Sequence, residues 1–204
     1  MRRFIYMVLN HNTMVKSEMI NIMKLLMKKR ESELTIREIS LIRNINYKSA
    51  YEAIGKLEKQ GSIIVQKKGN SRVCKAAYRL TKTIYAAEKE KLEEIIRKKD
   101  MKVIYDELYK LNMQFIAILF GSHAKGQETR NSDIDVLIIS DRAEKIEKKI
   151  SWIPKKIHIT SITYNDFIEM LQTRRFNVVS EAIKDNVIFI GLEDYYRFLE
   201  NANR

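Results

Sequence analysis

Cysteine, proline and glycine are scarce in this sequence, whose 204 residues include one Cys, one Pro and six Gly. Because Cys74 is alone, the chain cannot form an internal disulfide or a cysteine-based zinc site, which fits the cytoplasmic location that we expect. No stretch approaches the ~20 apolar residues of a membrane-spanning helix, so we expect no membrane partner. The apolar run over residues 4–9 is short and lacks a small-residue cleavage site, which makes it a poor secretory signal.

Acidic charge is scarce in the first half of the chain. Residues 1–100 contain 23 Lys and Arg against 11 Asp and Glu, a net charge of +12, whereas residues 101–204 contain 15 of each. The whole net charge of the protein therefore belongs to the first half. Such an asymmetry predicts two domains with different partners, and a basic domain indicates a polyanionic partner such as nucleic acid.

Two aspartates open an apolar run in the second half. The run over 115–120 ends abruptly at Gly121-Ser122, and a polar loop leads to Asp133-Ile134-Asp135. Residues i and i+2 of a strand point to the same face, so both carboxylates are expected to lie together. Two close carboxylates repel each other unless a cation lies between them, and Mg²⁺ takes one or two carboxylates plus substrate phosphates. The pattern therefore predicts metal-assisted handling of a nucleotide.

The spacing of Gly121-Ser122, ten residues and Asp133-Ile134-Asp135 resembles the signature of the DNA polymerase beta-type nucleotidyltransferase superfamily, most closely its minimal prokaryotic branch. The resemblance implies that Gly121, Ser122 and Lys125 bind the phosphates of an NTP such as ATP. It implies that Asp133 and Asp135 are catalytic and hold Mg²⁺ or Mn²⁺. It also implies transfer of a nucleoside monophosphate to a protein or other hydroxyl acceptor, in an antitoxin-like role toward a toxin-like partner.

One position departs from that superfamily, whose active members carry a third carboxylate on the strand after Asp-x-Asp. The strand predicted over 157–162 presents His158 and Thr160 outward and contains no acid. Two-metal phosphoryl transfer then loses a ligand, so nucleotide binding is expected to survive better than catalysis. His158 is either a substitute base or a strand histidine satisfied by its neighbours. Further candidate triphosphate contacts, or simply surface charges, are Arg130, Arg174 and Arg175.

Local signals in the first half predict three helices. Apolar residues at helical spacing predict the first over 17–30. Thr35, with a glutamate three residues later, forms a capping box before a helix over 36–43. Asn46 is expected to cap a third helix over 47–59.

After the third helix the apolar period changes to two, and a hairpin is expected over 62–68 and 72–80. Three helices and a basic hairpin resemble the winged helix-turn-helix domains of prokaryotic regulators. In such domains the third helix enters the major groove of duplex DNA and the hairpin contacts phosphates. The alternative is a domain for protein contact or dimerisation, although the concentration of positive charge favours DNA. The candidate groove residues are Tyr47, Lys48, Ser49 and Tyr51, and the candidate phosphate contacts are Lys67, Lys68 and Arg72.

The predicted fold is a two-domain α+β and α/β chain. A winged helix-turn-helix domain over 1–82 is joined by a helical connector over 83–112 to a nucleotidyltransferase-like domain over 113–204. Strands alternate with helices in the last segment, which predicts a mixed sheet covered by helices. The apolar stripe of the charged connector also predicts a homodimer seam.

Two functions remain open from the sequence. The first is a metal-dependent nucleotidyltransferase with a DNA-binding winged helix. The second is a DNA-binding transcriptional regulator whose transferase-like domain is a non-catalytic nucleotide sensor or dimerisation module. The intact Gly-Ser and Asp-x-Asp elements favour the first, and the missing third acid favours the second.

Overall fold

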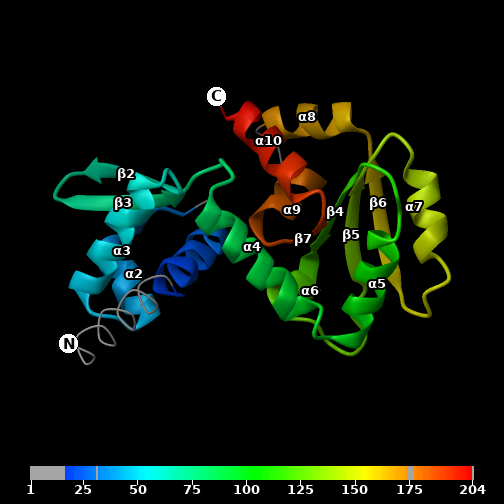
Figure 1. The fold of residues 1–204 in the computed structure, drawn as a ribbon, viewed down its shortest axis with the longest axis horizontal. Coiled ribbons are helices and arrows are strands. Elements are labelled where there is room, and N and C mark those ends of the chain that lie inside the picture. The colour runs from blue at the N-terminus through cyan, green and yellow to red at the C-terminus, as the bar shows by residue number, and fades with distance from the viewer. Residues whose placement is uncertain (1–16, 31, 174–176, 204) are drawn as a thin grey trace, which may run out of the picture. The chain divides into compact units, whose positions relative to one another are not determined.

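The computed structural model of the chain describes residues 17–30, 32–173 and 177–203 (Figure 1). The chain divides into two compact units, Met1–Ala87 and Glu88–Arg204, and the boundary falls inside helix α4 (Lys82–Ile95). The first unit contains 18 Lys and Arg against 6 Asp and Glu, and the second contains 20 of each, so the net charge of +12 belongs to the first. Within the described ranges, no helix has the length and apolar character needed to cross a membrane. Arg174 and Arg175 lie outside the described residues.

The first unit combines helices with a small antiparallel sheet. Residues 17–28 are helical, and the strand order in the sheet is β1-β3-β2. The helices and the hairpin expected from the sequence are confirmed, except that the second strand of the hairpin ends at Ala76 and does not extend to residue 80. The two-residue strand β1, which pairs with β3, carries no sequence signal of its own. The remaining elements are β1 (Leu34–Thr35), α2 (Ile36–Arg43), α3 (Tyr47–Lys59), β2 (Ile63–Lys68) and β3 (Ser71–Ala76).

Side-chain caps fix where α2 and α3 begin. Thr35 Oγ1 accepts a hydrogen bond from the Glu38 N–H at 3.2 Å, and the Glu38 carboxylate accepts one from the Thr35 N–H at 2.7 Å. Asn46 Oδ1 accepts from the Ser49 N–H at 2.8 Å. These bonds satisfy amides that have no partner within a helix, so the expected starts are confirmed.

The second unit is built on a four-stranded mixed sheet of order β6-β5-β4-β7. Strand β4 (Ile116–Phe120) is antiparallel to both of its neighbours, β5 (Ile134–Ile139) and β7 (Val187–Ile190). Strand β6 (Ile157–Ile162) runs parallel to β5. The expected mixed sheet covered by helices is confirmed. The helices are α5 (Lys99–Tyr109), α6 (Gly121–Lys125), α7 (Ala143–Ile150), α8 (Tyr164–Gln172), α9 (Val178–Lys184) and α10 (Leu192–Ala202).

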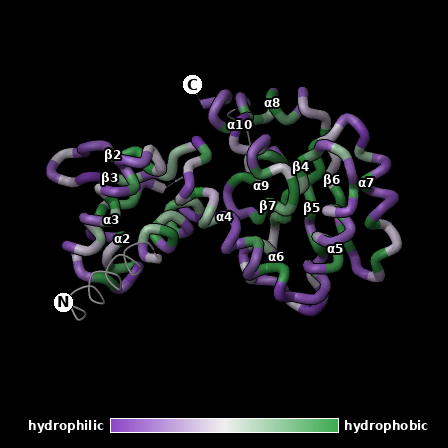
Figure 2. The backbone as a smooth tube through the Cα atoms, viewed as in Figure 1, coloured by the Kyte–Doolittle hydropathy of each residue, from purple (hydrophilic) through white to green (hydrophobic). Residues whose placement is uncertain are grey.

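Helices cover the two faces of this sheet as separate layers. On one face, alternate residues of β5 join a buried cluster with residues of α5 and α7. On the other face, α9 and α10 contact β4, and Figure 1 shows these helices across the sheet from α5. The strands are the most hydrophobic part of this unit in Figure 2, as expected for strands buried on both faces. Helix α5, which falls in the range expected as a connector, contributes Met101, Ile104 and Leu108 to the core.

A buried polar network ties the first residues of the second unit to its last helix. The Tyr196 hydroxyl donates to Glu88 Oε1 at 2.7 Å, and Lys91 Nζ lies 2.8 Å from Glu88 Oε2. Lys91 also donates to Asn186 Oδ1 at 3.3 Å. Glu88 is only 4% exposed, so these partners compensate a carboxylate that would otherwise be costly to bury. Residues 88–95 of α4 therefore belong structurally to the second unit.

Candidate functional site

The centre of the candidate site is the close approach of Gly121 to Asp135. Strand β4 ends at Phe120, which lies opposite Asp135 in the antiparallel register, and Gly121 follows with a φ of 70°. A Cβ atom on residue 121 would lie 2.3 Å from Asp135 Oδ2. Glycine is therefore required here twice, because φ is positive and because a side chain would occupy the place of the carboxylate. The strand-to-helix turn thereby brings the Gly-Ser element against the Asp-x-Asp element, as the sequence predicts.

Both aspartates of the Asp-x-Asp element face basic side chains of β6 and its leading residue. Lys156 Nζ lies 2.7 Å from Asp133 Oδ2, and His158 Nδ1 lies 3.3 Å from Asp135 Oδ1. The parallel register pairs Asp135 with His158, and the Lys156 carbonyl accepts from the Ile134 N–H at 2.9 Å. Each acid is therefore matched with one basic group on the neighbouring strand.

The carboxylates offer hard oxygen ligands to a divalent cation. Asp133 Oδ1 is buried and has no hydrogen-bond partner among the described residues, which is an unfavourable state for a carboxylate oxygen unless a cation approaches it. The ammonium of Lys156 repels such a cation, but this side chain is 81% exposed and can rotate away. The chain fits a metal held by Asp133 and Asp135 once Lys156 has moved. No group of three or more His, Cys, Asp and Glu side chains stands ready for a metal in the part of the chain that the structure describes.

The outward positions of β6 are filled as the sequence predicts. His158 lies beside Asp135, and Thr160 is paired with Leu137 further along the strand. No acidic side chain stands at either position, so β6 adds no third carboxylate to those of Asp133 and Asp135. His158 does have a specific neighbour, since its ring nitrogen is within reach of Asp135.

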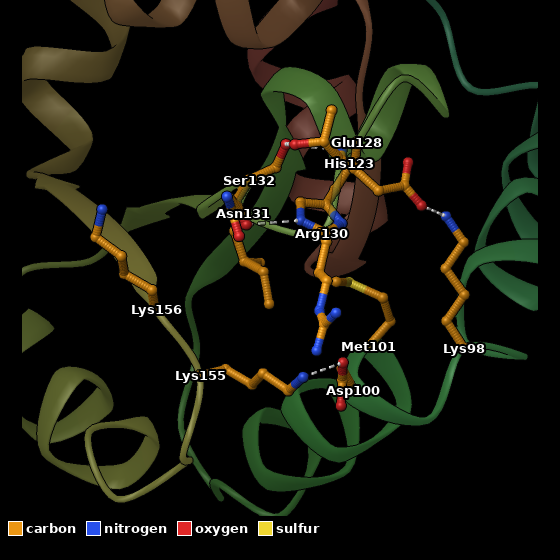
Figure 3. Close-up of a pocket in the computed structure, with 12 residues that line it drawn as sticks. Lys98, Asp100, Met101, His123, Glu128, Arg130, Asn131, Ser132, Lys155 and Lys156 are labelled. Carbon is orange, nitrogen blue, oxygen red and sulfur yellow. Dashed lines mark hydrogen bonds and ion pairs between the residues drawn. The ribbon is translucent and has the colours of Figure 1, made fainter.

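Ser122 and Lys125 both lie on the short helix α6 that starts at Gly121. Among the described residues, neither the Ser122 hydroxyl nor the Lys125 ammonium has a hydrogen-bond or ion-pair partner, so both are available to a ligand. His123, on the same helix, turns instead toward the following loop, where Nε2 lies 3.4 Å from the Ser132 carbonyl oxygen. Figure 3 shows His123 and Ser132 at the rim of a neighbouring pocket.

Lys156 is the site residue that sequence reasoning missed. Its signal was the alternation Lys156-Ile157-His158, which places two basic side chains on one face of a strand. Only the parallel pairing of β5 with β6 brings that face to the aspartates, and sequence spacing does not reveal strand pairing.

The candidate DNA contacts of the first unit separate into two groups. Arg72 lies against Tyr51, with Nη1 donating to the Tyr51 hydroxyl at 3.3 Å, and Lys67 is the cross-strand partner of Arg72. Lys68 is one residue along the strand, so it points to the other face of the hairpin, where it forms an ion pair with Glu33. The side chains of Tyr47, Lys48, Ser49 and Tyr51 are all exposed on α3.

Comparison with known families supports the prediction of a nucleotidyltransferase-like domain in the second unit. Residues 90–190 match the family model described as a nucleotidyltransferase domain. The matched range contains the Gly121-Ser122 turn, Asp133 and Asp135 and lies within the second unit. No curated protein and no solved structure matches the chain. The second unit therefore contains a nucleotidyltransferase domain.

Proposed function

We propose that the second unit binds an NTP such as ATP together with Mg²⁺ or Mn²⁺ and transfers the nucleoside monophosphate to a hydroxyl group. In this reaction the acceptor oxygen bonds to the α-phosphorus, the bond between the α- and β-phosphates breaks, and pyrophosphate leaves. The hydroxyl proton passes to solvent or to a nearby base. A side chain of a toxin-like partner protein is the acceptor class that the resemblance to minimal nucleotidyltransferases suggests.

The observation that carries this proposal is the contact between Gly121 and the Asp135 carboxylate. A bound triphosphate must lie over the turn and still share a cation with the aspartates, which requires the two elements to be adjacent. The turn and the aspartates can be this close because Gly121 has no Cβ atom, which would lie 2.3 Å from Asp135 Oδ2. Asp133 and Asp135 would hold the metal, which would neutralise phosphate charge when bound.

Within this arrangement, Ser122 and Lys125 are assigned to the phosphates. Both are on α6, immediately after the turn, and both have a polar group without a partner among the described residues. The ammonium of Lys125 supplies positive charge, and the hydroxyl and backbone N–H groups of the turn supply hydrogen bonds.

Transfer can be tested with α-labelled ATP and Mg²⁺ or Mn²⁺, using the chain itself and candidate toxin-like proteins as acceptors. We expect label on protein, abolished by Asp133→Asn and by Asp135→Asn. Asp141→Asn is the matched control, because exposed Asp141 follows the far end of β5 and undergoes the same chemical change. Label transfer that survives both active-site substitutions refutes the proposal.

A second candidate is a nucleotide sensor without transferase activity. It is favoured by His158, which stands beside Asp135 where active superfamily members are expected to have an acid, and by Lys156 on Asp133. Because Lys156 and His158 already contact the two carboxylates, these carboxylates should bind a metal ion weakly. Saturable ATP binding by calorimetry, with no label transfer to any acceptor, supports the sensor and excludes the enzyme.

For the first unit we propose binding to duplex DNA through α3 and the hairpin, as in a winged helix-turn-helix domain. The support is the net charge of +12 and the surface formed by Tyr51, Arg72 and Lys67. Tyr47 lies next to Tyr51, with ring centroids 6.3 Å apart, and both rings are exposed. Aromatic and basic side chains that gather on one face suit base and phosphate contacts respectively. A homodimer, expected from the connector helix, would place two such faces on the DNA.

The two faces of the hairpin give a matched test of DNA binding. The double variant Lys67→Gln with Arg72→Gln removes two positive charges from the hairpin face that lies against Tyr51 of α3. The double variant Lys68→Gln with Lys75→Gln removes two positive charges from the opposite face, where both lysines form ion pairs with Glu33. Fluorescence anisotropy with a labelled duplex should show weaker binding, with a salt slope smaller by about 2, only for the first pair. If both double variants lose DNA affinity equally, the net charge attracts DNA non-specifically. If neither loses affinity, the hairpin does not contact the DNA.

A further inference from the structure

A second concave site lies in the nucleotidyltransferase unit, on the other side of β5 from the aspartates. Its volume is 550 Å³, which is within the usual range for small-molecule sites. Ile134 lines it, and because Ile134 alternates with Asp133 and Asp135 along the strand, the carboxylates point away from this pocket. The walls come from the start of α5, the loop after α6 and the residues before β6 (Figure 3).

The ionic groups of this pocket leave one cation without a carboxylate. Lys98 forms an ion pair with Glu128, and this pairing lowers the pKa of the glutamate. Lys155 Nζ lies 2.8 Å from Asp100 Oδ2. Lys156, which also lines the pocket, forms an ion pair with Asp133. Arg130, by contrast, has no ion-pair or hydrogen-bond partner in the described part of the chain.

Arg130 is also the side chain that points into the space. In Figure 3 its guanidinium extends from the loop toward the ends of Lys155 and Asp100, which rise from the opposite wall. In Figure 3 two cationic side chains thus extend toward the same space, and one of them, Lys155, is paired with a carboxylate. An anion in the pocket would lie between a guanidinium and an ammonium, both of which are on exposed side chains that can turn toward it.

The other lining groups supply neutral hydrogen bonds and an apolar surface. The exposed amide of Asn131 and the hydroxyl of Thr129 stand at the rim. Among the described residues, the buried His123 Nδ1 has no hydrogen-bond partner, so a small turn of the ring would offer it to a ligand. Met101 and Ile134 form the apolar part of the wall. A ligand with an anionic end and an uncharged organic body would use all of these groups.

We propose that this pocket binds a small phosphorylated molecule, with its phosphate between Arg130 and Lys155 and its organic part toward Met101 and Ile134. Phosphate fits the planar guanidinium, which can donate two parallel hydrogen bonds. The site is separate from the proposed triphosphate site and does not require a metal. Its existence is independent of whether the domain catalyses transfer, and a ligand here would be an effector or a second substrate.

Binding is measured by calorimetry on the full chain in metal-free buffer containing EDTA, with inorganic phosphate and with AMP as probes. We expect saturable binding of both, and tighter binding of AMP. Arg130→Gln and Lys155→Gln should each weaken binding by about tenfold or more, since each removes a charge-assisted hydrogen bond. Asp100→Asn should strengthen binding, because it removes the carboxylate that competes with the ligand for Lys155. Lys148→Gln, on the exposed surface of α7, removes the same charge as Arg130→Gln and should have no effect.

The outcomes separate this site from others. Binding that is lost in Lys148→Gln as strongly as in Arg130→Gln reflects net charge and overturns the proposal. So does binding that Arg130→Gln and Lys155→Gln leave unchanged, which would place the phosphate elsewhere, or the absence of saturable binding. Circular dichroism of each variant confirms that the fold is retained. Since no metal or triphosphate is present, these results do not depend on the outcome of the transfer experiment.

Discussion

Substitution of Gly121 by alanine should destroy the candidate metal site at a modest cost in stability. The residue has a φ of 70°, and left-handed backbone costs an L-amino acid about 1–2 kcal/mol. The new Cβ would lie 2.3 Å from Asp135 Oδ2, whereas carbon and oxygen pack at about 3.5 Å, so the carboxylate must move by roughly 1 Å. Metal sites tolerate such shifts poorly, and we expect Mn²⁺ affinity to fall about 10- to 100-fold.

Gly126→Ala is the matched control for this prediction. Gly126 ends α6 with a φ of 69°, nearly that of Gly121, but a Cβ atom there would have nothing within 4 Å. Both variants should therefore lose similar stability in urea denaturation followed by circular dichroism. Only Gly121→Ala should lose Mn²⁺ binding, measured by electron paramagnetic resonance of the free ion. Wild-type Mn²⁺ affinity in Gly121→Ala, or an equal loss in Gly126→Ala, would refute the reasoning.

Three further predictions follow from single contacts. Lys156→Met should raise Mn²⁺ affinity about two- to fivefold in the same titration, because it removes an exposed ammonium from Asp133. Glu107→Gln should lower the urea midpoint at neutral pH, and this difference should shrink as the pH falls. Hydrogen bonds from Lys110 and Lys149 hold the pKa of Glu107 below its usual 4.5, so their contribution to stability is lost once the pH falls through this lowered pKa. Asn46→Ala should cost about 1 kcal/mol in the unfolding of the first unit, through loss of the α3 cap; an unchanged midpoint would contradict it.

Local signals account for most of what could be predicted from the sequence. The capping box of Thr35 and Glu38 lies within four residues, and both its hydrogen bonds form. The common face of Asp133 and Asp135 follows from the period of a strand, whatever the strand pairs with. The Gly-Ser turn could be predicted because an apolar run ends abruptly at Gly121.

The parts that escaped prediction depend on which distant segments meet. Lys156 contacts Asp133 because β6 pairs with β5 in parallel. The helix and the loop between these strands contain no sequence signal that predicts this pairing. Lys98 and Glu128 are 30 residues apart, and their ion pair forms a wall of the second pocket. The boundary between the units falls inside α4 and not in a linker, so no Gly- or Pro-rich segment marks its position.

The matching of β5 with β6 also bears on how the sheet assembles. In the observed register Asp135 faces His158 and, two residues earlier, Asp133 binds Lys156. A slip by one residue in either direction would set Asp135 against an isoleucine, Ile157 or Ile159. The two basic residues therefore contribute to the selection of this strand alignment. Replacing His158 with an acid would improve a metal site and remove half of that selection, since two carboxylates would then repel across the strands. A bound metal should therefore stabilise such a variant against unfolding more than it stabilises the original chain.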